Sequence, residues 1–283
     1  MPLTTNLFKS IRSRMGFPPK WIDKKIGTKT ITVREGTIRK KTDYDDAWFY
    51  LCSQNSKLIF DVGANVGGDT LYALLANPNN QIYSIEANPK ALSQVADNVI
   101  QNQFSERVRF INKFVSDSNN ENIKFWTVGT GAAGSRYKDH AKTAAHKNQS
   151  INVSSISIDA LCEQFGVIPD FIKIDVEGAE YDVLLGCQKC LKNNQTRILV
   201  EMHSNKDLSM QDNTNKILKI CSNLNYSVWY LSNGDLLKSS EQNKNRGRCH
   251  LLLQPEKWAY PNWLNGIKQS TPLNDVFLKE QNA

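Results

Sequence analysis

The sequence predicts a doubly wound α/β fold, in which helices cover both faces of a mostly parallel sheet. From Lys57 onward, short apolar segments typical of strands alternate with segments of helical periodicity, as in parallel sheets with crossover helices. A glycine-rich turn follows the first strand, and an acidic residue follows the second. This order is typical of proteins that bind a nucleoside-bearing cofactor at the edge of such a sheet.

Hydrophobic periodicity places the individual elements. Strands are expected at 58–62, 81–85, 108–112, 171–175, 197–202, 226–230 and 248–253. Helical patterns lie near 68–76, 89–103, 179–192 and 212–224. Two more strands are expected at 122–128 and 151–158, on either side of a long connection rich in Gly and Ala. Because structureless connections of this length are usually functional, residues 129–150 are expected to form a lid loop.

A basic appendage is expected to precede the main domain. Its predicted parts are an amphipathic helix within 1–15, a hairpin of 30–33 and 37–40 about Glu35-Gly36, and a helix capped by Asp43. The chain is then divided into an appendage at 1–50, a main domain at 51–270 and a C-terminal tail at 271–283.

Composition and charge limit the classes of partner. The 283 residues carry a formal net charge of +7, yet residues 1–41 hold eleven Lys or Arg against two acids, and the remainder holds 24 against 26. A nucleic-acid footprint across the main domain is therefore not expected. A homo-oligomer, and a peripheral membrane contact through the basic N-terminal segment, stay open. No apolar run reaches the roughly 18 residues of a membrane span, and no signal peptide is evident, so we expect a cytoplasmic protein.

The cysteines do not indicate a metal centre. Of the six, only Cys187 and Cys190 have ligand spacing, and no second pair accompanies them.

The glycine-rich turn, Asp61 to Gly68, carries the strongest functional signal. Glycines let the backbone turn sharply and approach a ligand, and the helix that follows offers free N–H groups. Glu86 lies about 20 residues beyond the turn, where an acid binds the ribose hydroxyls of a cofactor. The spacing G-x-x-x-G-G differs from the G-x-G-x-x-G of nicotinamide-binding proteins. Asn65 stands where a middle glycine is common, and Asn tolerates a positive φ better than most residues.

Six segments resemble, in order and spacing, those of the FkbM family of methyltransferases. They are D-V-G-A-N-V-G-G at 61–68, S-I-E-A-N-P at 84–89, V-S-D at 115–117, S-I-D-A-L at 157–161, F-I-K-I-D-V-E-G-A-E at 171–180 and L-V-E-M-H at 199–203. The resemblance spans roughly 57–203. It implies the Rossmann-like sheet of class I methyltransferases, S-adenosylmethionine as cofactor, and O-methylation of natural products, sugars or lipids.

The resemblance also implies a set of cofactor-binding residues. Gly63, Asn65 and Gly67, in the motif that Asp61 opens, would line the methionine and ribose side of the cofactor. Glu86 would bind the ribose with Asn88 nearby, and Ser116 and Asp117 would contact the adenine. An ordinary polar turn is the alternative for Asp117.

The ends of two neighbouring strands supply the candidate catalytic residues. Alternation sends Lys173 and Asp175 to one face, where Asp175 would face the methyl donor or would form a buried Lys–Asp brace. Glu201 and His203 end the next strand, and His203 is a candidate general base because its ordinary pKa is near neutral. It could equally be a hydrogen-bonding residue. Glu177 would face the substrate or begin a helix.

The expected reaction is therefore methyl transfer from S-adenosylmethionine to a hydroxyl of a small molecule. A peptide or carboxylate acceptor is the first alternative, and a nucleic-acid methyltransferase using the basic N-terminus is another. Against the latter, Glu201 occupies the position of a Lys expected in RNA 2′-O-methyltransferases, and D-V-E-G replaces the N-P-P-Y of amino-methylating enzymes. A divalent cation held by Asp175 and Glu201 is conceivable, but no clustered ligand motif supports one.

Overall fold

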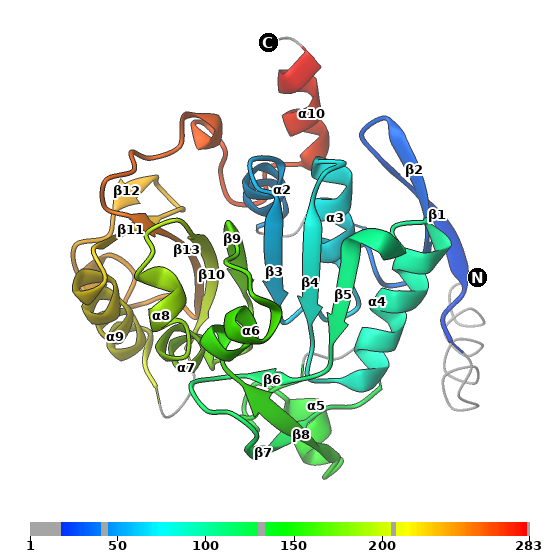
Figure 1. The fold of residues 1–283 in the computed structure, drawn as a ribbon, viewed down its shortest axis with the longest axis horizontal. Helices are drawn as coiled ribbons and strands as arrows, with labels where there is room; N and C mark the ends of the chain where they lie inside the picture. The colour runs from blue at the N-terminus through cyan, green and yellow to red at the C-terminus, as the bar shows by residue number, and fades with distance from the viewer. Residues whose placement is uncertain (1–17, 41–44, 130–133, 205–207, 282–283) are drawn as a thin grey trace.

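A computed structural model of the chain describes residues 18–40, 45–129, 134–204 and 208–281. Its main sheet comprises β3 (Leu58–Val62), β4 (Gln81–Ile85), β5 (Val108–Ile111), β9 (Phe171–Ile174), β10 (Arg197–His203), β11 (Tyr226–Tyr230), β12 (Asp235–Leu236) and β13 (Arg248–Pro255). The eight strands lie in the order β12-β11-β13-β10-β9-β3-β4-β5 (Figure 1). The five from β10 to β5 are parallel, and β13 runs antiparallel to both of its neighbours. The predicted fold class is confirmed.

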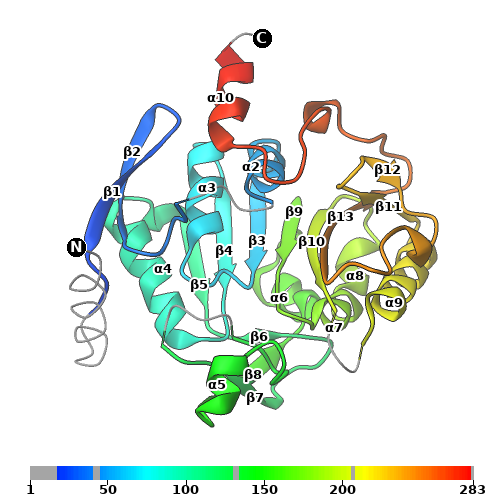
Figure 2. The same ribbon diagram turned by 180° about the vertical axis from the view of Figure 1, so that it is seen from behind.

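Helices cover both faces of this sheet, as a doubly wound fold requires (Figures 1 and 2). One face packs against α2 (Asp46–Gln54), α3 (Gly68–Ala76) and α4 (Pro89–Gln101), and the other against α6 (Ile158–Phe165), α7 (Glu180–Leu185), α8 (Gln188–Leu191) and α9 (Met210–Asn223). The single helical pattern at 179–192 is thus two helices. They part at Gly186, where an added Cβ would lie 2.2 Å from the Ser116 carbonyl oxygen.

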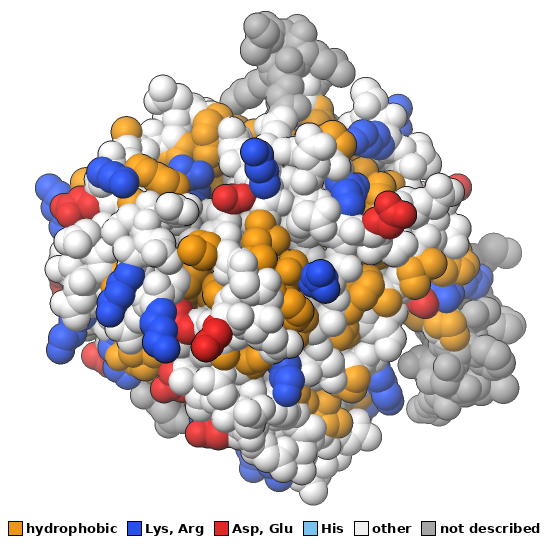
Figure 3. Space-filling view, in the orientation of Figure 1, with side chains coloured by type: hydrophobic (Ala, Val, Ile, Leu, Met, Phe, Trp, Pro, Cys, Tyr) orange, Lys and Arg blue, Asp and Glu red, His pale blue; other side chains and the backbone are white. Residues whose placement is uncertain are grey.

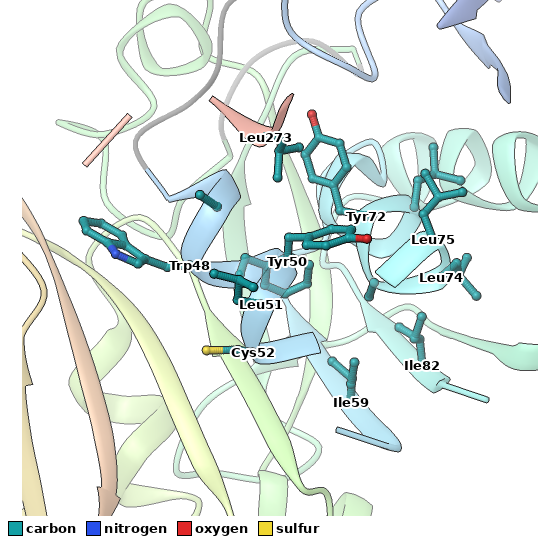
Figure 4. Close-up of a cluster of buried hydrophobic side chains, with 14 of the residues drawn as sticks. Trp48, Tyr50, Leu51, Cys52, Ile59, Tyr72, Leu74, Leu75, Ile82 and Leu273 are labelled. Carbon is teal, nitrogen blue, oxygen red and sulfur yellow. The ribbon is translucent and has the colours of Figure 1, made fainter. Parts of the chain in front are cut away.

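Helix α2 is part of the main core. Figure 4 shows Tyr50 of α2 beside Tyr72 of α3, with Trp48 on the opposite side of α2. Trp48 is 1% exposed. The domain boundary expected after residue 50 therefore lies inside a core helix, and its side chains help to bury the sheet.

The N-terminal hairpin differs from the prediction. It pairs β1 (Trp21–Ile26) with β2 (Lys29–Arg34) across a turn at Gly27, whose φ is +58°. Residues 30–33 are thus in the second strand, and 37–40 form no strand, so the predicted pairing was wrong. Gly27 and Gly36 both take positive φ, so the glycines alone do not distinguish the two possible turns. The predicted helix within 1–15 and the Asp43 cap fall outside the described residues.

A second, smaller sheet lies at the carboxyl ends of the central strands (Figure 1). It comprises β6 (Phe114–Val115), β7 (Asn122–Trp126) and β8 (Ser150–Ile156), which confirms the two extra strands. Within the expected lid loop, α5 (Lys142–His146) forms, and Ala141 and Ala144 pack against Trp126. The described part of this connection is thus packed structure. A lid function for 129–150 stays a prediction.

Short helices make up the remaining elements. Short 3-10 helices lie at Ser105–Arg107, Ser240–Gln242 and Asn262–Leu264, and α10 spans Leu273–Gln281. The expected tail is therefore largely helical. Its Phe277 ring contacts Tyr50 edge-on, with 5.0 Å between ring centroids, and this docks α10 on α2.

The surface does not carry one basic patch on the face that Figure 3 shows. There, Lys and Arg side chains are scattered and interspersed with acidic ones. None of the helices in the described ranges is both long and apolar enough to span a membrane.

Candidate active site

Functional side chains gather at the carboxyl ends of β3, β9 and β10. In the parallel register, Asp61 lies beside Lys173. Ile172 and Ile174 are buried in the opposite core, so the predicted alternation along β9 is confirmed. Strand alternation thus places Asp61, Lys173 and Asp175 on the face covered by α2 and α3.

The glycine-rich turn holds the β3 end against β9. Gly63 has φ +86°, and an added Cβ would lie 1.8 Å from the Asp175 carbonyl oxygen. Asn65 has φ +49°, as its substitution for a glycine suggested, and Gly67 at φ +89° precedes the first turn of α3. Conformation therefore favours the residue type at all three positions, and at Gly63 close contact requires it as well.

Glu86 stands at the centre of a narrow cavity beyond β4. The backbone N–H groups of Asn65 and Asn88 donate to its two carboxylate oxygens, at 2.8 and 2.7 Å. Burial raises the pKa of Glu86, and these N–H groups oppose the rise. A carboxylate accepts about four hydrogen bonds, so each oxygen keeps capacity for a ligand hydroxyl. The geometry suits a vicinal diol such as a ribose.

Both apolar and polar residues line the rest of this cavity, which we call the Glu86 cavity. It has a volume of about 60 Å³ and is lined by Val62, Gly63, Asn65, Ile85, Glu86, Ala87, Asn88, Ala91, Lys113, Phe114, Val115, Phe125, Gly134, Asp175, Val176 and Glu177. The Glu86 carboxylate thus shares this cavity with the apolar side chains of Phe114, Val115 and Phe125.

Three predicted cofactor residues either do not line this cavity or already form hydrogen bonds with other groups of the protein. Asn88 caps α4 and donates to Thr127 and to the Gly129 carbonyl. Ser116 is buried with its hydroxyl 3.1 Å from that of Ser118. The cavity lining, within the described chain, does not include Ser116 or Asp117. Adenine contacts by Ser116 and Asp117 stay a prediction.

Lys173 is the positive centre of a buried carboxylate cluster. Its ammonium donates to Asp69 and lies 3.5 Å from Asp175 Oδ2. Burial would lower the pKa of Lys173, but the charges of Asp69, Asp175, Asp45 and Asp61 together raise it well above its ordinary value. Lys173 is therefore charged and forms the brace that the sequence left open, with Asp69 as its main partner.

Asp61 is held in a different charge environment. Burial raises its pKa to about 7, against the opposing effect of Lys173. The Thr70 hydroxyl donates to Asp61 Oδ2 at 2.7 Å and lies 2.8 Å from that of Ser84. Asp61 thus ties β3 to α3 and β4 beneath the turn, and it lies off both cavities as the described residues form them.

His203 has a buried partner that sequence analysis did not identify. Its Nδ1 lies 3.0 Å from Oε1 of Glu180, which is fully buried at the start of α7. Burial would lower the pKa of His203, but the hydrogen bond and charge of Glu180, with the charges of Asp175 and Glu177, raise it to about 10. These carboxylates therefore favour the protonated form of His203. Its role as a general base stays a prediction.

Glu177 and Glu201 approach the same imidazolium from two sides. Glu177 Oε2 lies 3.6 Å from His203 Nε2 and 3.5 Å from Nδ1 of His140, and Glu201 Oε1 lies 3.7 Å from His203 Nε2. Glu177 has φ +52° and lies just before α7. It therefore stands near a helix start and also lies close to both imidazoles. The connection that carries His140 therefore contacts the site directly.

A larger cavity adjoins the first, and we call it the acceptor cavity. It measures about 310 Å³ and is lined by Pro19, Glu35, Gly36, Thr37, Arg39, Asp45, Asp46, Gly63, Ala64, Asn65, Val66, Gly68, Asp69, Tyr72, Gln94, Lys173, Asp175 and Glu201. Gly63, Asn65 and Asp175 line both cavities. Their shared wall is the place where two ligands could meet.

A family model described as the methyltransferase FkbM domain matches residues 61–228. The chain belongs to the FkbM methyltransferase family. It is 27% identical over 170 residues to the 2-O-methyltransferase NoeI of Sinorhizobium fredii, which covers 56% of this chain and 68% of the relative.

Solved structures resemble this FkbM methyltransferase only loosely. One is the methyltransferase FkbM from Methylobacillus flagellatus, at 13% identity and TM-score 0.44, covering 71% of this chain and 44% of the other. Another is an O-methyltransferase from Bacillus cereus in complex with SAH, at 15% identity and TM-score 0.41, covering 74% and 79%. The chain thus spans less than half the length of the first of these structures.

Sequence analysis of this FkbM methyltransferase located most of the site but not its partners. Lys173, Asp175, Glu177, Glu201 and His203 do converge. The partners it missed are Asp69, Glu180, Asp45 and His250. Asp69 directly follows the glycine turn, and Glu180 ends the D-V-E-G-A-E segment, so both lie in or beside recognised motifs. Asp45 and His250 carry no local signal.

Replacing His203 by alanine is expected to destabilise this methyltransferase. The change leaves the Glu180 carboxylate buried without its cationic partner, at a cost of about 1–3 kcal/mol or more. Urea unfolding would measure the loss, and His146→Ala, at an exposed position on α5, is the control. In a Glu180→Gln background, His203→Ala should cost much less. An equal cost in both backgrounds would contradict the pairing.

Proposed function

We propose that this protein transfers a methyl group from S-adenosylmethionine to a hydroxyl oxygen of an uncharged, polar small molecule. The observation that carries the proposal is the pair of adjoining cavities, one centred on Glu86 and the other lined by polar side chains, which share Asp175. The match to a relative named as a 2-O-methyltransferase supports oxygen as the acceptor atom.

The residues present fit the cofactor. Glu86 would hold the ribose hydroxyls, and Phe114 and Phe125 offer apolar surfaces for the adenine. The turn from Gly63 to Gly67 would face the methionine side, where α3 begins with free N–H groups. When bound, the cofactor supplies an activated methyl group on a sulfonium, so the protein's main task is alignment.

Asp175 is the residue best placed to orient the acceptor. Burial would raise the pKa of Asp175, but the charges of Lys173 and His203 lower it below its ordinary value. It is therefore an ionised hydrogen-bond acceptor on the shared wall, 25% exposed in its side chain. An acceptor hydroxyl that donates to Asp175 would lie beside the cofactor site, with Lys173 and His203 holding the carboxylate in place.

The charge of the acceptor cavity favours a neutral acceptor over an anionic one. Six acidic side chains line it, Glu35, Asp45, Asp46, Asp69, Asp175 and Glu201, against two basic ones, Arg39 and Lys173. Burial raises the pKa of Asp45 and Asp46, so these two contribute least to the negative charge, but the other four still outnumber the basic groups. A carboxylate or a nucleic-acid phosphate would be repelled there. Sugar-like polyols instead match its many hydrogen-bonding groups. Peptide and carboxylate acceptors, and nucleic acid, are therefore disfavoured.

Calorimetry with S-adenosylhomocysteine tests the cofactor part of the proposal. Glu86→Ala should weaken binding by about 1.5–3 kcal/mol, the range for a hydrogen bond to a charged group. Glu163→Ala, on the exposed side of α6, should bind as the native protein does. A turnover screen should then favour neutral polyols over carboxylates. Binding of NAD without S-adenosylhomocysteine would contradict the assignment.

A further inference from the structure

Three buried side chains converge beside the acceptor cavity, and two of them, Asp45 and Glu201, line it. Asp45 lies just before α2, Glu201 is on β10, and His250 is its direct cross-strand neighbour on β13. One ligand atom from each lies within 4.8 Å of the other two. Asp45, Glu201 and His250 are 4%, 5% and 4% exposed.

Buried polar atoms of these side chains have no hydrogen-bond partner. Within the described part of the chain they are Asp45 Oδ2, His250 Nε2 and Glu201 Oε1, although Glu201 Oε1 lies 2.7 Å from the Arg248 guanidinium in an ion pair. The nearest approach of His250 Nε2 to Glu201 Oε2 is 3.8 Å, too long for a hydrogen bond. Leaving a buried carboxylate oxygen and an imidazole nitrogen unpaired is costly, so the arrangement calls for a group between them.

The neighbouring cluster is different. Asp175, Glu177 and His203 also approach one another within 4.8 Å. There, however, His203 is hydrogen-bonded to Glu180 and Asp175 is paired with Lys173. Those groups already satisfy one another. The buried atoms that lack partners are instead those of Asp45, Glu201 and His250.

We propose that Asp45, Glu201 and His250 bind a divalent transition-metal cation. One imidazole nitrogen and two carboxylate oxygens form a donor set that suits Mn²⁺ or Zn²⁺. The Trp48 ring lies 5.5 Å from that of His250 and restrains its orientation. Arg248 occupies Glu201 Oε1 at 2.7 Å, which leaves Oε2 to face the site.

The position of this site gives the cation a role at the acceptor. Asp45 and Glu201 line the acceptor cavity and His250 lies behind them, so the open coordination positions face the cavity. A hydroxyl oxygen of the acceptor could fill one of them, and its pKa would then fall. This role rests on the proposed methyl transfer, whereas binding of the cation does not.

Binding of Mn²⁺ to the full chain, freed of metal by chelation, tests the site. Electron paramagnetic resonance should show one Mn²⁺ bound per chain, with nitrogen coupling from one histidine. Mn²⁺ should also raise the melting temperature, because a ligand of the folded state stabilises it. His250→Gln and Asp45→Asn should lose the binding and the thermal shift. His146→Gln, an exposed control, should keep both.

The outcomes separate this proposal from the function. If the native chain binds neither Mn²⁺ nor Zn²⁺ at millimolar concentration, or if His250→Gln and His146→Gln bind alike, the metal site is wrong. Asp45→Asn preserves the shape of the side chain and replaces a buried carboxyl group whose Oδ2 has no hydrogen-bond partner, so the variant should melt no lower than the metal-free native chain and remain testable. Metal binding without any methyl transfer would uphold the site and overturn the function. Full turnover in the presence of chelator would remove the cation's role.

Discussion

Replacing Gly63 by alanine should abolish cofactor binding. It should also lower the free energy of unfolding by about 4 kcal/mol or more, a loss typical of severe steric clashes. The added Cβ would lie 1.8 Å from the Asp175 carbonyl oxygen, and the φ of +86° is unfavourable for alanine. The turn can relieve that clash only by moving off β9. Because this turn also positions Asn65 against Glu86, the cofactor site would be distorted with it.

Gly166 provides a matched control for this substitution. It ends α6 with φ +64°, and a Cβ added there would have no neighbour within 4 Å among the described residues. Gly166→Ala therefore carries the conformational cost without the clash, about 1 kcal/mol. Thermal unfolding and titration with S-adenosylhomocysteine measure both effects. Equal losses in the two variants would show that conformation alone, and not contact with Asp175, requires Gly63.

Lys173→Met should have the other large effect. Methionine fills much of the same space but leaves Asp69, Asp175 and the nearby Asp61 without their shared positive charge. Removing one partner of a buried ion pair costs about 3–5 kcal/mol, because the remaining charge is buried and uncompensated. The lysine side chain is 4% exposed, so solvent screens this cluster little. Urea unfolding should show the loss directly.

An exposed ion pair provides a comparison for this loss of stability. Lys244 pairs with Glu241 at 2.6 Å, but the two side chains are 41% and 60% exposed. Lys244→Met should therefore change stability by less than about 1 kcal/mol. Adding Asp69→Asn to Lys173→Met should restore part of the lost stability by removing one unpaired carboxylate. If the double variant is no more stable than Lys173→Met, charge imbalance is not the cause of the loss.

Local sequence was sufficient to predict the sheet and the cofactor turn. Strands such as Leu58–Val62 and Gln81–Ile85 are short apolar runs between turn residues. Local composition is therefore enough to predict where each strand begins and ends. Gly63, Asn65 and Gly67 are residue types that tolerate the positive φ they adopt, which the local sequence is enough to indicate. The alternation that sends Lys173 and Asp175 to one face is likewise a property of any strand.

Tertiary structure decided which groups meet. Trp21–Ile26, and not residues 37–40, pairs with the strand that ends at Arg34. Both possible turns contain glycine, so local sequence did not distinguish one pairing from the other. His203 looks like a neutral base in sequence, but Glu180 on a neighbouring helix raises its pKa to about 10. Likewise His250 faces Glu201 only through the antiparallel register of β13. The sequence determined which residues can carry the chemistry, and long-range packing determined their charges and partners, because burial and electrostatic interactions depend on distance in space.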